Sequence, residues 1–105
     1  MQIEVLYFEA CPNYLKAIAN LKEALARRGD VLSTEITMTE LKTEQEAGDR
    51  AFLGSPTFLV DDKDLFGVPD DPTYGLRCRI FILKDRVTGI PSADDFVSVL
   101  DKISH

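Results

Sequence analysis

Two cysteines, Cys11 and Cys78, are the residues of this sequence with the clearest capacity for chemistry. A thiolate attacks disulfides, forms disulfides and binds soft metal ions. The only histidine, His105, is the last residue, so the side chains that would complete a tetrahedral zinc site are missing. The sequence therefore favours thiol chemistry, and it predicts neither a cofactor nor a resident metal.

Cys11 lies where an apolar segment meets a helical pattern, in the stretch VLYFEACPNYLKAIANL. Pro12 suits the first helical turn, because its missing N–H would have had no partner there. Cys11 is then at or beside the N-cap, where unpaired amide groups and the positive end of the helix dipole lie near its sulfur. Such surroundings favour the thiolate. The alternative is that Cys11 is simply a small buried hydrophobic residue.

The elements that position Cys11 follow from the hydrophobic pattern. The apolar run Ile3 to Phe8 predicts a strand that is buried on both faces. Apolar residues at helical spacing predict a helix from Pro12 that stops at Gly29. The segment Val31 to Met38 predicts a second strand, which a crossover helix makes parallel to the first.

The second half of the chain carries weaker signals of the same kind. Thr43 and Glu46 have the spacing of a capping box and predict a short second helix. Thr57 to Val60 predicts a third strand, with Asp64 to Phe66 as its antiparallel partner. Ser92 can cap a last helix.

Together these elements predict one α/β domain over residues 1–105 in the order β-α-β-α-β-β-α. A central mixed sheet would be flanked by helices, with an insertion around residues 67–91, which is the outline of a thioredoxin-like fold. The segment Cys78 to Lys84 either pairs directly with the third strand or belongs to the insertion. Cys78 is remote in the first layout and can meet Cys11 in the second. A disulfide needs Cα atoms within about 7 Å, so the sequence leaves both layouts open.

The motifs LYFEACPNY and GSPTFLVDDKDLFG resemble the thioredoxin/glutaredoxin superfamily, and CPNY is similar to its CPxC and CPxS motifs. With YGLRCR, the chain resembles more narrowly a group of small bacterial thioredoxin-like proteins that are sometimes labelled alkylmercury-lyase-like. The resemblance covers residues 3–103. It implies that Cys11 is the nucleophile and that Pro56 is a cis-proline beside it.

In such a topology the proline that opens the third strand leaves a strand edge able to pair with a bound peptide or thiol. The expected substrate-binding residues are Pro12, Tyr14, Ser55, Pro56 and Thr57. Their expected partner is a thiol or a disulfide, either in a protein or in a glutathione-like molecule.

Tyr14 departs from the family pattern, because it stands where a CPxC motif has its second cysteine. Tyr14 fits the apolar stripe of the helix, and its hydroxyl could also reach the thiol or a substrate. Cys78 becomes the candidate resolving cysteine. The flanking Arg77 and Arg79 would help to ionise it, and one of them could hold the carboxylate of a thiol such as glutathione.

Charge and composition narrow the remaining classes of function. The formal net charge of −6 argues against nucleic-acid binding, which needs a basic face. No apolar run approaches the roughly 20 residues of a membrane span, and the first residues resemble no signal peptide, so a cytoplasmic location is expected. Two acidic loops lack the spacing of a calcium-binding loop, and we predict that they are solvated turns. They contain Asp61, Asp62, Asp64, Asp70 and Asp71.

The leading hypothesis is a thiol–disulfide oxidoreductase that uses Cys11, resolved by Cys78 or by an external thiol. The first alternative is a non-catalytic binder of soft metals or thiol-reactive species through both cysteines. The second is a redox-inactive thioredoxin-like scaffold for protein partners, since a fold does not guarantee its usual activity.

Overall fold

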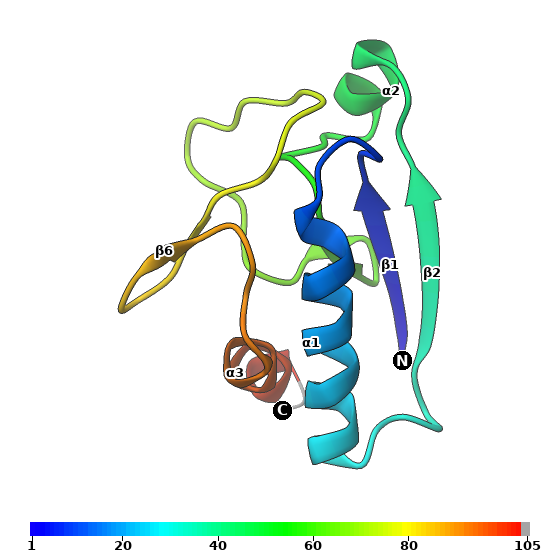
Figure 1. The fold of residues 1–105 in the computed structure, drawn as a ribbon, viewed down its shortest axis with the longest axis vertical. Helices are drawn as coiled ribbons and strands as arrows, with labels where there is room; N and C mark the ends of the chain where they lie inside the picture. Colours follow the sequence, from blue (N-terminus) through cyan, green and yellow to red (C-terminus); the bar gives the residue numbers. More distant parts are fainter. Residues whose placement is uncertain (104–105) are drawn as a thin grey trace.

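In the computed structural model, which describes residues 1–103, the chain forms a small mixed α/β structure around a four-stranded sheet (Figure 1). The strand order is β2-β1-β3-β4. β1 and β2 are parallel, β3 is antiparallel to β1, and β4 is antiparallel to β3. The strands are β1 (Gln2–Tyr7), β2 (Glu35–Glu40), β3 (Thr57–Val60) and β4 (Lys63–Asp64).

The helices are α1 (Asn13–Arg28), α2 (Glu44–Asp49) and α3 (Ala93–Ile103). α1 ends where the sequence predicts, because Gly29 takes a left-handed conformation with φ 72° and its N–H donates to the Ala26 carbonyl. The two predicted caps also form. The Glu46 N–H donates to the Thr43 hydroxyl at 3.0 Å, and the Asp95 N–H donates to the Ser92 hydroxyl at 3.1 Å.

Helices cover both faces of the sheet, as expected from the apolar pattern of β1. Ile3 and Val5 of β1 belong to a core cluster that α1 and α3 cover, and those two helices lie side by side (Figure 1). Leu6 belongs to a second cluster on the other face, with Ala47 of α2 and with Phe52. The prediction that the first strand is buried on both faces is therefore confirmed.

Two strands differ by more than one residue from the bounds that the sequence predicts, whereas β1 is displaced by one residue only. β2 begins at Glu35, because the chain first makes a turn in which Val31 and Leu32 are exposed to solvent. β4 covers Lys63–Asp64, although the N–H of the next residue, Leu65, still donates to the Phe58 carbonyl at 2.8 Å.

The insertion decides between the two layouts for the segment that contains Cys78. Residues 67–80 form an irregular segment, and a short hairpin follows, made of β5 (Phe81–Ile82) and β6 (Val87–Thr88). This hairpin forms a separate two-stranded sheet and lies on the far side of α1 from β1 and β2 (Figure 1). The layout in which residues 78–84 pair directly with β3 is therefore wrong.

Candidate functional site

The first part of the site is the turn between β1 and α1. The Cys11 N–H donates to the Phe8 carbonyl at 3.0 Å, which closes this turn. The N-cap of α1 is Pro12, and no side chain caps the first helical turn. Cys11 therefore lies immediately before the N-cap, as predicted, and the N–H groups of that turn have no side-chain acceptor. Cys11 itself is only 2% exposed, whereas Pro12 is exposed.

The second part of the site is the segment that leads into β3. Because β3 runs antiparallel to β1 and Leu6 lies opposite Thr57, the residues before β3 lie beside those after β1. The Ser55–Pro56 peptide bond is cis, as the resemblance implies. The carbonyl oxygen of Ser55 is 3.6 Å from the Cys11 sulfur. Thr57 is buried, and its hydroxyl donates to the Gly54 carbonyl at 2.7 Å.

The third part is the segment 67–80, which we call the strap. Its backbone pairs with Ser55 on both sides of Cys78. The Ser55 N–H donates to the Arg77 carbonyl at 2.7 Å, and the Arg79 N–H donates to the Ser55 carbonyl at 3.0 Å. These two bonds form an isolated parallel bridge between Ser55 and Cys78. The strap therefore occupies the backbone of Ser55, one of the residues that the sequence analysis assigned to substrate binding.

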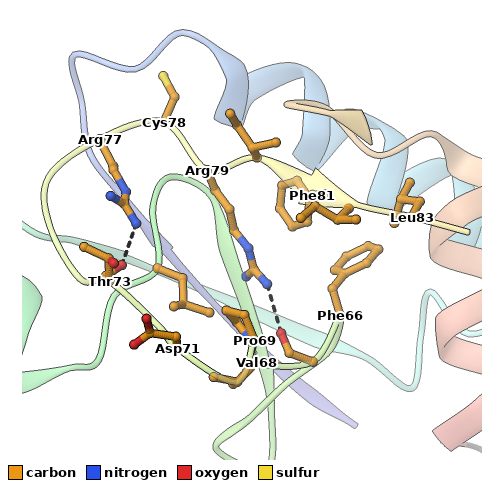
Figure 2. Close-up of a pocket in the computed structure, with 14 residues that line it drawn as sticks. Phe66, Val68, Pro69, Asp71, Thr73, Arg77, Cys78, Arg79, Phe81 and Leu83 are labelled. Carbon is orange, nitrogen blue, oxygen red and sulfur yellow. Dashed lines mark hydrogen bonds between the residues drawn. The ribbon is translucent and has the colours of Figure 1, made fainter. Parts of the chain in front are cut away.

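The side chain of Arg79 fixes the strap to β4. Its guanidinium donates to both carboxylate oxygens of Asp64, at 2.8 and 3.1 Å. It also donates to the Gly67 carbonyl at 3.2 Å, and this bond is the dashed line from Arg79 in Figure 2. The guanidinium carbon also lies 4.5 Å from the ring centroid of Phe81. The side chains of Arg79 and Asp64 are 7% and 4% exposed. The prediction that Asp64 belongs to a solvated turn is therefore wrong, and Arg79 is already occupied.

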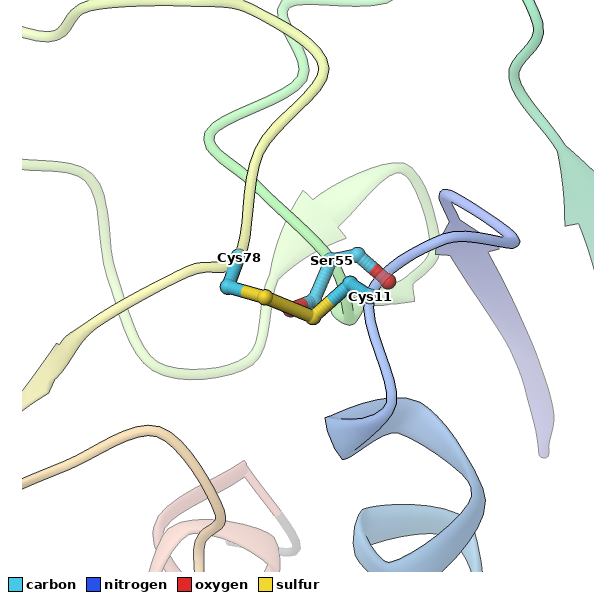
Figure 3. The surroundings of a disulfide bond; sticks show 3 residues. All are labelled: Cys11, Ser55 and Cys78. Carbon is cyan, nitrogen blue, oxygen red and sulfur yellow. A yellow bond between two sulfur atoms is a disulfide. The ribbon is translucent and has the colours of Figure 1, made fainter.

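The strap brings the two cysteines together. Cys11 and Cys78 form a disulfide across 67 positions of sequence, with their Cα atoms 5.5 Å apart (Figure 3). The pairing that the sequence left open is therefore present in the structure. The two halves of the bond differ in their surroundings, because Cys11 is buried and Cys78 is exposed.

Tyr14 does not take part in this bond. Its ring packs against that of Tyr7, with the centroids 4.7 Å apart, and the residue is 8% exposed. Its hydroxyl donates to the Glu9 carboxylate at 3.1 Å. Burial, together with this hydrogen bond and the negative charge of Glu9, raises the pKa of Tyr14 above its usual value. Tyr14 is therefore a neutral member of the apolar stripe of α1, and its hydroxyl is bonded to Glu9.

A pocket of about 510 Å³ lies between the strap and the β5 strand (Figure 2). Its lining is mainly apolar and includes Phe66, Ile80 and Phe81, together with Cys78. Arg77 also lines it; this side chain is exposed and donates to the Thr73 carbonyl at 2.6 Å. Of the two arginines that flank Cys78, Arg77 is thus the one that remains accessible to an anionic group.

Gly54 is a part of the site to which the sequence analysis assigned no role. Its φ is 130°, and a Cβ built on it would lie 2.7 Å from the Cα of Arg79. Only a residue without a side chain lets the strap approach the Ser55 backbone so closely. Neither this approach nor the pair of Arg79 with Asp64 has a local signal in the sequence, because both depend on the path of the strap.

We expect the variant Gly54→Ala to loosen the strap. The matched control is Gly67→Ala, since Gly67 also has a positive φ, 86°, but its added Cβ would meet nothing within 4 Å. The control should lose roughly 1–2 kcal/mol of unfolding free energy from backbone strain alone. Gly54→Ala should lose about 1–3 kcal/mol more, because the new methyl group must displace the strap backbone. Urea unfolding of both variants measures the difference, and equal losses would contradict the close approach.

No protein-family model, curated protein or solved structure matches the chain. Across residues 1–103 no helix is both long and apolar enough to cross a membrane. The same residues contain no group of three or more acidic, cysteine or histidine side chains that could hold a metal ion. The functional argument therefore rests on the geometry around the disulfide.

Proposed function

We propose that this protein is a thioredoxin-like thiol–disulfide oxidoreductase in which Cys11 and Cys78 are the redox pair. The observation that carries the proposal is the disulfide between a cysteine at a helix N-terminus and a cysteine on the strap. A cytoplasmic location would strengthen it, because disulfides in that compartment are usually redox-active rather than structural.

The fold supports the same proposal. The sheet order β2-β1-β3-β4, with helices on both faces, agrees with the mixed sheet flanked by helices that we expect of a thioredoxin-like protein. The proposal also explains how the protein can do without a second cysteine at position 14, where Tyr14 replaces that of a CPxC motif. The second thiol of the pair comes from the strap instead of the helix, and Cys78 is the disulfide partner that a cysteine at position 14 would have been.

The proposed reaction transfers two electrons between thiols. Two thiol molecules, RSH, reduce the protein disulfide to two cysteine thiols and leave as the disulfide RSSR. The substrate is a thiol or a disulfide, in a protein or in a small glutathione-like molecule. In the reduced protein the amide groups that open α1 favour a Cys11 thiolate, whereas the carbonyl of Ser55 favours the protonated thiol.

A disulfide-reduction assay tests the proposed function. The protein is added in catalytic amounts to insulin and dithiothreitol, and the rate of insulin reduction is compared with that of Cys11→Ser and Cys78→Ser. We expect the wild type to accelerate the reduction and each variant to lose at least a factor of about 10, because either change removes the redox pair.

The outcomes separate the hypotheses. Loss of activity with Cys11→Ser alone would indicate a mechanism in which an external thiol replaces Cys78. If the wild type does not accelerate reduction of insulin or of glutathione disulfide, the oxidoreductase proposal is wrong and a redox-inactive scaffold is favoured. If the wild type retains a soft metal ion and either Cys11→Ser or Cys78→Ser abolishes that binding, the hypothesis of a non-catalytic metal binder is favoured instead.

A further inference from the structure

The two sulfurs of the disulfide differ in how they can be reached. A thiolate attacks a disulfide along the S–S axis, on the side of one sulfur that is opposite to the other sulfur. One of the two cysteines therefore receives the incoming thiol, and the other leaves as a thiolate. Which of them plays which part depends on the space behind each sulfur.

The space behind the Cys11 sulfur is closed. Cys11 is 2% exposed, and Ser55, whose carbonyl oxygen is 3.6 Å from that sulfur, is fully buried. The strap is bonded to the Ser55 backbone on both sides of Cys78, which keeps this cover in place while the disulfide is intact.

The space beside Cys78 is open. Cys78 is exposed and lines the pocket of about 510 Å³, whereas Cys11 does not, and the Cys78 sulfur points away from the Arg77 guanidinium (Figure 2). The apolar walls and the accessible Arg77 of that pocket suit a small thiol that carries a carboxylate.

On this route the leaving group is the Cys11 thiolate. The sulfur whose thiolate is more stable leaves faster. Cys11 lies before the uncapped N-terminus of α1, where N–H groups and the helix dipole stabilise negative charge. These N–H groups oppose the effect of the Ser55 carbonyl on the leaving Cys11 thiolate. Attack on Cys78 therefore uses the accessible sulfur, whereas attack on Cys11 would require the strap to open first.

We propose that, in the oxidised protein, the incoming thiol attacks Cys78 and expels Cys11. This inference rests on the proposed function and reverses the order that the resemblance implies, in which Cys11 is the residue that bonds to the substrate. The thiolate RS⁻ forms a bond to the Cys78 sulfur, the Cys11–Cys78 bond breaks, and its electron pair stays on Cys11 as a thiolate. A second thiol then attacks the mixed disulfide, which releases RSSR and the Cys78 thiolate.

The test identifies which cysteine of the wild-type protein is attacked. The oxidised protein is mixed briefly with glutathione or, in a second arm, with sulfite, a small nucleophile that forms a stable S-sulfonate on the attacked sulfur. Acid stops the exchange, and the free thiols are then alkylated with N-ethylmaleimide under denaturing conditions. Digestion after glutamate residues separates Cys11, in residues 10–23, from Cys78, in residues 47–105, and mass spectrometry identifies the adduct on each.

We expect at least ten times more adduct on Cys78 than on Cys11 with both probes. The control is the same protein unfolded in urea, in which both sulfurs are equally accessible and the preference should fall to less than about threefold. A preference for Cys11, or a ratio that does not change on unfolding, overturns the inference and leaves the proposed function standing. If the folded protein reacts with neither probe, its disulfide is inert, and the proposed function falls together with the inference.

Discussion

Reduction of the Cys11–Cys78 disulfide is expected to lower the free energy of unfolding by about 4 kcal/mol. The bond closes a loop across 67 positions of sequence, and in the chain-entropy model a cross-link of this length restricts the unfolded chain by roughly that amount. The native state loses little in return, because the strap keeps its backbone bonds to Ser55 and its side-chain bonds from Arg79. Urea unfolding with and without a phosphine reductant measures the difference.

Cys78→Ser is the variant of choice for this comparison. Since Cys78 is exposed, a serine hydroxyl at this position can be solvated, whereas Cys11→Ser would also bury a hydroxyl group. Cys78→Ser should unfold like the reduced wild type, and the reductant should not change it further. If Cys78→Ser without reductant is as stable as the oxidised wild type, the expected contribution of the cross-link is refuted.

The stabilisation of the fold by the Cys11–Cys78 disulfide also determines the reduction potential of that disulfide. By a thermodynamic cycle, the free energy that the disulfide adds to the fold equals the free energy by which the fold favours the disulfide. About 4 kcal/mol corresponds to a reduction potential about 90 mV lower in the folded protein than in its unfolded chain. Equilibration with glutathione buffers, in the presence and absence of urea, measures this shift. An unshifted potential would mean that the fold does not favour the bond.

The local elements could be predicted from the sequence because their signals are local. The apolar run of β1, the stop of α1 at Gly29 and the caps at Thr43 and Ser92 each depend on residues within a few positions of one another. The structure contains all of them. The coarse α/β architecture follows from their order, because a helix between two neighbouring strands makes those strands parallel.

The site could be predicted only in part. The placement of Cys11 before α1 follows from Pro12, which is its neighbour in sequence. The meeting of Cys11 with Cys78 depends instead on residues 67–80, which have no periodic pattern from which a path could be read. Their path is set by contacts between distant residues, above all by Arg79 with Asp64 and by the close approach at Gly54. Such contacts leave no pattern in the sequence of either segment alone. For this reason the sequence analysis wrongly placed Asp64 in a solvated turn.

The variant Arg79→Ala is expected to lower the free energy of unfolding by about 3–5 kcal/mol. It would leave the Asp64 carboxylate, which is 4% exposed, without its cation, and an uncompensated buried charge costs about that much. It also removes the bond to the Gly67 carbonyl and the packing on Phe81, so the strap should detach more easily. The disulfide should then be reduced faster by glutathione, because the buried Cys11 sulfur becomes accessible in addition to that of Cys78.

The matched control is Arg77→Ala, two positions earlier on the strap. The side chain of Arg77 is exposed and bonds only within the strap, to the Thr73 carbonyl, so its loss should cost less than about 0.5 kcal/mol. The double variant Asp64→Asn with Arg79→Met should recover part of the loss, because it removes the buried charge together with its partner. Urea unfolding of the four proteins measures these terms. If Arg79→Ala is no more harmful than Arg77→Ala, the buried pair does not hold the strap.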